Sequence, residues 1–135
     1  FFTAWMAGYP GVGSSTAQLD DPDSDGVDNL GEYALGGNPD DSSDTGDAGI
    51  TGATVDGGTN YLEYVYAKRT DAEMRGLTYT LEQTGNLVTG PWITNGTAEV
   101  LGTGSIDSDF DAVTNRVPTD FAVQQFLKVK VESSF

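Results

Sequence analysis

The sequence contains no cysteine and no histidine, and only 6 of its 135 residues are lysine or arginine. The absence of cysteine and histidine excludes disulfide scaffolds, thiolate nucleophiles, the usual zinc sites and histidine-based catalytic triads. No apolar run approaches the ~20 residues that a membrane-spanning helix needs. We therefore expect no insertion into a membrane, and two large classes of enzyme are excluded.

Negative charge dominates what is present, because 21 Asp and Glu residues face those 6 basic ones and give a formal net charge of −15. Nucleic acids and anionic membranes are polyanions, so neither is an expected partner. Residues 1–60 hold 11 acidic residues and no basic one, whereas residues 61–135 hold 10 acidic and all 6 basic residues. A compact segment with that charge repels itself, which leaves two alternatives: disorder, or neutralisation by a bound cation.

One motif in the acidic half has the ligand spacing of an EF-hand calcium loop. Counted from Asp21, oxygen ligands fall at positions 1, 3, 5, 7, 9 and 12, and Gly26 falls at position 6, where such loops turn sharply. The ligands predicted for Ca²⁺ are Asp21, Asp23, Asp25, the carbonyl of Val27, Asn29 and Glu32. The alternative interpretation is an acidic loop that is simply solvated.

Two departures from the EF-hand limit the analogy. Asp28 occupies position 8, where an aliphatic residue is usual, and the segment 10–15 (PGVGSS) breaks any entering helix. An exit helix over residues 27–35 is predicted from its apolar spacing, and Gly36 follows it. A single loop with one helix favours a structural ion rather than a sensor, with a Kd of ~10⁻⁴–10⁻³ M. Calcium at such concentrations exists outside cells, so we expect an extracellular or cell-surface location.

A second acidic alternation, Asp107, Asp109 and Asp111, lacks the glycine and the closing carboxylate of a calcium loop. It is either a second cation site or the polar edge of a turn.

The second half of the chain has the two-residue period of β-strands, with turn residues between the runs. Five runs are 61–68, 77–82, 97–101, 112–117 and 125–131, and 49–55 is left open as a sixth. They predict a mainly β fold, a small antiparallel sandwich or open barrel, preceded by a short N-terminal helix, the calcium loop and its exit helix. The corresponding organisation is a helix–loop–helix cap over 1–40, an acidic Gly-rich linker over 41–59 and a β-module over 60–135.

Aromatic residues suggest a further binding function. Tyr64, Tyr66 and Trp92 could stack on sugar rings if they are exposed, or fill the interface between sheet and helices if they are buried. No set of residues predicts catalysis, because most carboxylates lie in the loop or in turns.

The chain resembles a C-terminal module of secreted proteins from verrucomicrobial and related bacteria. The residues that carry the resemblance are Phe2 with Trp5–Pro10, the loop Asp21–Glu32 with Tyr33–Pro39, Leu77–Tyr79, Asn86–Leu87 with Trp92, and Gln125–Val129. The loop also resembles dockerin and thrombospondin type 3 repeats, although only one copy is present. The resemblance implies a position at the end of long exported chains, behind polysaccharide-active or adhesive domains, and implies no activity.

These observations predict a non-catalytic, calcium-stabilised structural or attachment module. Its expected partners are the remainder of a larger protein or further copies of itself, assembled through open sheet edges into a polymer. The alternative is a carbohydrate-binding module of a secreted polysaccharide-active enzyme.

Overall fold

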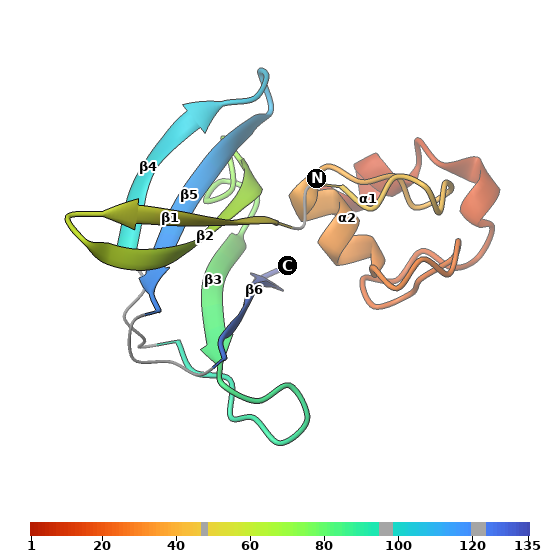
Figure 1. Cartoon of the computed structure of the whole chain (residues 1–135). Helices are drawn as coiled ribbons and strands as arrows, with labels where there is room; N and C mark the ends of the chain where they lie inside the picture. The colour runs from red at the N-terminus through yellow and green to blue at the C-terminus, as the bar shows by residue number, and fades with distance from the viewer. Residues whose placement is uncertain (47–48, 95–98, 120–123) are drawn as a thin grey trace.

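The fold consists of a helical cap (residues 1–46) and a β-module (residues 49–135), which lie side by side (Figure 1). The computed structural model describes residues 1–46, 49–94, 99–119 and 124–135. The cap contains helix α1 (Phe2–Met6), the 3-10 turn η1 (Pro10–Val12) and helix α2 (Asn29–Leu35). The β-module contains β1 (Ile50–Asp56), β2 (Thr59–Arg69), β3 (Leu77–Thr84), β4 (Glu99–Ser105), β5 (Phe110–Pro118) and β6 (Phe126–Ser133).

The strands form two antiparallel sheets. One has four strands in the order β1-β2-β5-β4, and the other pairs β3 with β6. The ladders within the four-stranded sheet are regular except for a register shift between Val100 and Gly102 in β4. The predicted mainly β class is confirmed, and two facing sheets correspond to its sandwich form.

Aromatic side chains join the two sheets. The ring of Tyr66 on β2 stacks on that of Tyr79 on β3, with centroids 5.9 Å apart and planes 14° from parallel. A second contact joins β2 to β6: the hydroxyl of Tyr64 accepts a hydrogen bond from the Val129 amide (3.2 Å). Strand β6 shows the predicted alternation from residue 127 onward, with Lys128, Lys130 and Glu132 exposed and the residues between them half-buried.

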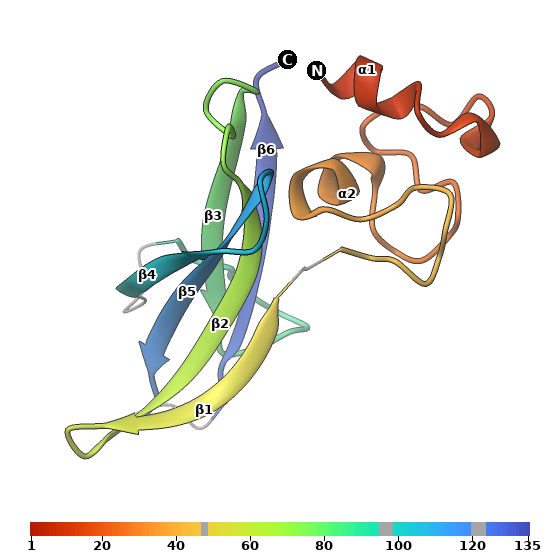
Figure 2. The ribbon, with the colours of Figure 1, turned by 90° about the horizontal axis from the view of Figure 1, so that it is seen from above.

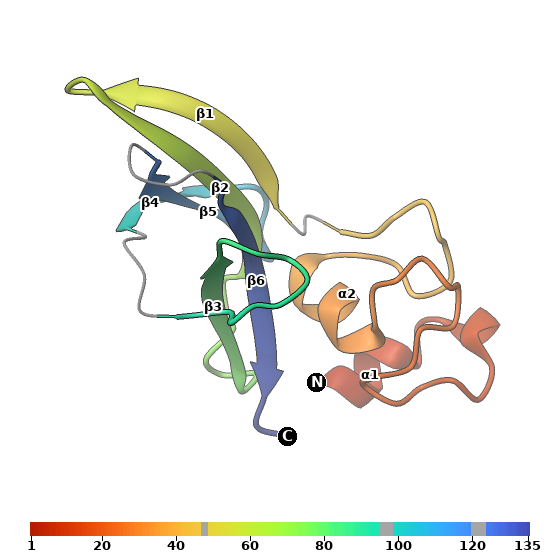
Figure 3. The same ribbon diagram turned by 60° about the horizontal axis from the view of Figure 1, so that its bottom comes forward.

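The cap packs its own aromatic residues around Tyr33 of α2, which is completely buried. Phe2 approaches the Tyr33 ring edge-on at 5.5 Å, and Trp5 lies 5.2 Å from it. Phe135 stacks on Phe2 at 5.7 Å, so the last residue packs against helix α1, and the N and C labels lie close together (Figure 3). Of the two helices, α2 lies nearer to the sheets (Figure 2).

Two predicted boundaries need correction, and a third lies outside the described residues. Helix α2 begins at Asn29 rather than at residue 27, because Asp28 caps it. Strand β1 lies inside the range 41–59 that was predicted as a linker, so the β-module begins about ten residues earlier than expected. The start predicted for the run 97–101, Thr97, lies outside the described residues, and β4 is described from Glu99.

Candidate metal centre

The loop before α2 is folded by its own carboxylates. Oxygens of Asp21 accept hydrogen bonds from the amides of Ser24 (2.8 Å) and Gly26 (3.1 Å), and an oxygen of Asp25 accepts one from the Val27 amide (2.7 Å). The backbone enters the left-handed region at Ser24 (φ 64°) and Gly26 (φ 94°). Glycine adopts that conformation without steric cost, which explains its place in the motif. The backbone of the loop therefore turns sharply between the aspartates.

Asp21, Asp23 and Asp25 form a cluster that could hold a metal ion, since each offers a carboxylate oxygen within 4.8 Å of the others. Asp21 is exposed, while Asp23 and Asp25 are half-buried. Oδ2 of Asp23 and Oδ2 of Asp25 are both buried without a hydrogen-bond partner. Burial, together with the charges of Asp25 and Asp21, raises the pKa of Asp23. A cation is the group that would relieve this repulsion.

Glu32, on the first turn of α2, is the fourth acidic residue of the predicted ligand set. It is fully buried, and neither of its two carboxylate oxygens has a partner among the described residues. Burial and then the charges of Asp23, Asp25 and Asp21 raise its pKa from 4.5 to about 8. A buried carboxylate normally forms an ion pair or binds a metal. Within the described part of the chain, Glu32 has no such partner.

Asn29 is also completely buried, and its two ends have different environments. Its amide nitrogen donates to the carbonyls of Ser15 (3.1 Å) and Ala17 (2.8 Å), which fixes the side chain against the preceding segment. Its oxygen, Oδ1, has no partner among the described residues. The sequence predicted the oxygen as a ligand but not the two hydrogen bonds that orient it.

Asp28, which departs from the EF-hand pattern, is the N-cap of α2. Its carboxylate accepts a hydrogen bond from the Gly31 amide (2.8 Å) and satisfies one of the donors that a helix leaves free at its start. An aspartate directly before an apolar helical run is a known start signal, so the sequence could have indicated this role.

Taken together, the loop brings three carboxylates to one place, and Glu32 and Asn29 at the start of α2 add buried oxygens that have no partner among the described residues. Carboxylate and carbonyl oxygens suit hard cations such as Mg²⁺, Ca²⁺ and Mn²⁺. The cluster of Asp21, Asp23 and Asp25 could hold such an ion.

The second acidic alternation is not brought together into a comparable cluster in the described part of the chain. Asp107 instead closes the turn between β4 and β5, because one of its oxygens accepts hydrogen bonds from the amides of Asp109 (2.7 Å) and Phe110 (2.9 Å). Asp111 lies on β5 opposite Lys68. Of the two alternatives, the structure agrees with the polar turn edge.

Of the two alternatives for the aromatic residues, exposure for stacking or burial in an interface, the structure shows burial for Tyr64 and Tyr66. Tyr64 and Tyr66 are only 5% and 7% exposed, because they fill the space between the two sheets. Trp92 is half-buried, and the Lys128 ammonium lies 4.3 Å from the centre of its ring. The three rings do not form an exposed row.

No protein family, curated protein or solved structure matches this chain. In the described residues there is no helix of sufficient length and apolarity to cross a membrane.

Proposed function

We propose that this chain is a non-catalytic extracellular module that is stabilised by one calcium ion and serves a structural or attachment role. The observation that carries the proposal is the buried Glu32 carboxylate, which has no partner among the described residues and whose pKa is raised by burial and by the charges of three aspartates. In this proposal the ion is held by Asp21, Asp23, Asp25, the Val27 carbonyl, Asn29 and Glu32. Its charge offsets the repulsion that the site otherwise contains.

Calcium is favoured over other hard cations by the number and variety of the ligands. Ca²⁺ accepts six to eight oxygens in a flexible arrangement, whereas Mg²⁺ demands near-ideal octahedral geometry and retains several waters. The spacing from Asp21 to Glu32 supplies six protein ligands, with Glu32 placed to contribute both of its oxygens. A flexible loop with that many oxygens suits the larger ion.

The structural role follows from the isolation of the loop. A single loop is expected to bind calcium weakly, so it would be filled where calcium is millimolar, outside the cell. At a free calcium concentration about five times the Kd, binding would stabilise the folded chain by about 1 kcal/mol. That contribution is significant for a domain whose total stability is of the order of 5–15 kcal/mol.

Thermal unfolding tests the proposal. Addition of millimolar calcium to chelator-treated protein should raise the Tm by several degrees, and the rise should vanish in Asp25→Ala. Glu73→Ala removes an exposed carboxylate remote from the loop and should leave the rise intact. An identical Tm with calcium and with chelator in the unmodified chain would refute the proposal.

We further propose that copies of this chain associate through β1. This strand is an open edge of the four-stranded sheet, its ladder is regular, and residues 50–55 carry no charge on a strongly anionic molecule. Natural sheets usually protect such edges with charged residues. Analytical ultracentrifugation at high protein and calcium concentration should detect assemblies that Val55→Lys dissolves. Val88→Lys, at an exposed loop position, is the matched control, and a monomer under all conditions would exclude this association.

Carbohydrate binding, the alternative function, depended on an exposed aromatic row. The burial of Tyr64 and Tyr66 removes that support.

A further inference from the structure

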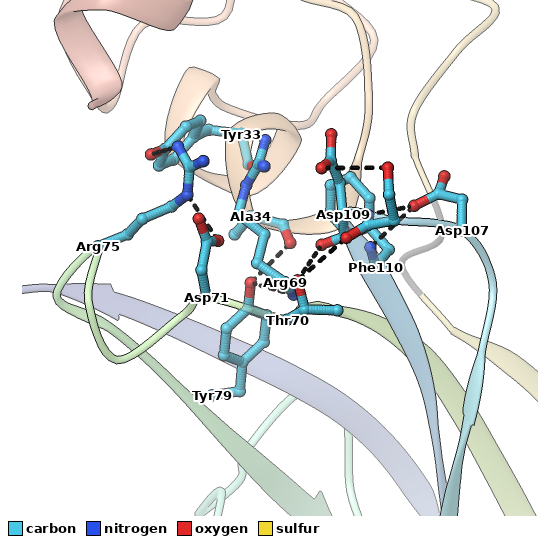
Figure 4. A network of polar contacts seen from close by, with 11 residues as sticks. Tyr33, Ala34, Arg69, Thr70, Asp71, Arg75, Tyr79, Asp107, Asp109 and Phe110 are labelled. Atoms are coloured by element: carbon cyan, nitrogen blue, oxygen red, sulfur yellow. Dashed lines mark hydrogen bonds and ion pairs between the residues drawn. The ribbon is translucent and has the colours of Figure 1, made fainter.

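The C-terminal end of α2 is held by side chains from the β-module (Figure 4). Nε of Arg69 on β2 donates to the carbonyl of Tyr33 (2.6 Å), and the hydroxyl of Tyr79 on β3 donates to the carbonyl of Ala34 (2.7 Å). The last carbonyls of a helix have no partner within the helix. Here two of them find partners on two different strands, so the end of α2 is fixed to both sheets.

Arg69 is an unusual residue, since it is 7% exposed and forms no ion pair with any described carboxylate. Its guanidinium lies between the rings of Tyr33 (4.4 Å) and Phe110 (4.7 Å). Burial lowers its pKa. What offsets this burial is the negative end of the α2 dipole, the Tyr33 carbonyl and the two aromatic faces. Three of those four contributions come from α2 itself or depend on its position.

A third contact fixes the side chain of Tyr33. Nη1 of Arg75 donates to the Tyr33 hydroxyl (2.7 Å), and Arg75 is itself held by Asp71 (2.7 Å). Tyr33 directly follows the proposed ligand Glu32. The β-module therefore holds the residue next to that ligand by hydrogen bonds to the backbone and to the side chain of Tyr33.

Helix α2 is too short to hold Glu32 in place alone. It has seven residues, and isolated helices shorter than about 12–15 residues are marginal in water. Its orientation therefore depends on what it packs against, and Glu32 must keep a fixed position to complete a cation site that begins eleven residues earlier at Asp21.

From these contacts we infer that Arg69 and Tyr79 are positioning residues for the calcium site. Residues of the β-module thus set the calcium affinity of a loop that lies in the cap. The inference rests on the proposed function. Arg69 and Tyr79 contribute no ligand; they hold the end of α2 so that Glu32 is already in place when the ion arrives. Coupling between binding events is reciprocal, so calcium in turn strengthens the attachment of the cap to the sheets.

The test compares calcium affinities of the whole chain and two variants by NMR titration, following the amide of Gly26 in the loop. Tyr79→Phe removes the hydroxyl, which donates to the Ala34 carbonyl and accepts from the Arg69 amide (3.3 Å), and keeps the ring that stacks on Tyr66. Of these two hydrogen bonds only the one to Ala34 reaches α2, and we expect its loss to raise the Kd for calcium about three- to tenfold. Arg69→Lys keeps the charge but loses the planar contact with both rings, and it should raise the Kd in the same direction.

Tyr61→Phe is the matched control, because Tyr61 lies under Arg116 (4.1 Å) and contacts no residue of α2 by any described interaction. Its calcium Kd should equal that of the unmodified chain. The same spectra report whether each variant is folded.

The outcomes separate the two proposals. If the unmodified chain binds no calcium, the proposed function fails. If it binds calcium and both Tyr79→Phe and Arg69→Lys keep its Kd, the function stands and the positioning role is wrong. A purely structural role would lower the Tm equally with and without calcium and leave the Kd unchanged, which also counts against the inference.

Discussion

At the scale of single residues, the proposed calcium site depends most on Glu32. Its carboxylate is fully buried and has no partner in the ranges that the structure describes, so it must either keep its proton or share its charge with a cation, because an isolated buried charge is costly. Three neighbouring aspartates make ionisation without a cation still less favourable. These two states of Glu32 predict opposite responses to mutation.

The effect of Glu32→Gln on the Tm should therefore change sign when calcium is added. In chelator at pH 8 the variant should melt no lower than the unmodified chain, because a neutral amide removes the repulsion from the aspartates. In millimolar calcium it should melt about 4 °C lower, the shift expected for a loss of about 1 kcal/mol. Circular dichroism melts measure both, with Glu73→Gln as the exposed control. A variant that melts lower than the unmodified chain by the same amount in both buffers would contradict the assignment of Glu32 as a ligand.

The same carboxylate predicts a pH dependence. The pKa of Glu32 is raised from 4.5 to about 8 without calcium, so between these values the folded chain keeps a proton that the unfolded chain releases. The free energy of unfolding without calcium must then fall as the pH rises through this window. Bound calcium keeps Glu32 ionised in the folded state and so removes this fall in the free energy of unfolding. The rise in Tm caused by calcium should accordingly grow from pH 5 to pH 8; a rise that is constant over this range would be inconsistent with the prediction.

At the scale of secondary-structure elements, α2 depends on its ends. Asp28 caps the start, and Gly36, with a left-handed φ of 84°, ends the helix. Asp28→Ala should lower the free energy of unfolding by about 1 kcal/mol, whereas Asp28→Asn, which keeps a capping oxygen, should change it little. Urea denaturation with and without calcium measures both. Equal stabilities for the alanine and asparagine variants would show that the cap does not stabilise α2.

Element types in this chain could be predicted from the sequence, because each follows from local patterning. The alternation of apolar residues in β6 and the spacing from Asp21 to Glu32 both depend only on neighbours in the chain. The hydrogen bonds from Arg69 and Tyr79 to α2 could not be predicted. They join residues 36 and 45 positions apart, and their acceptors are backbone carbonyls, which every sequence provides. Exposure of Tyr64 and Tyr66 was equally beyond the sequence, because it depends on which face the second sheet covers.

At the scale of the whole molecule, the cap and the β-module differ in what holds them together. The β-module has long antiparallel ladders that require no ion, whereas the cap concentrates acidic residues and contains two short helices. Regions with few long-range partners open first. Chelation should therefore open the cap before it affects the sheets.

Hydrogen exchange measured by mass spectrometry tests this order of opening. After chelation, peptides covering Asn29–Leu35 should exchange at least about tenfold faster, while peptides covering Thr59–Arg69 should change much less. The α2 amides serve as the probe and the β2 amides as the internal control. Equal acceleration in both regions would mean that calcium acts on the whole fold at once and not through the cap.

The most direct test of the account is isothermal titration of calcium into the chelator-treated chain. We predict one ion bound per chain, with a Kd of ~10⁻⁴–10⁻³ M and with binding abolished in Asp25→Ala. The absence of any binding at about 10 mM calcium, well above that Kd, would contradict the proposed calcium site and the functions derived from it.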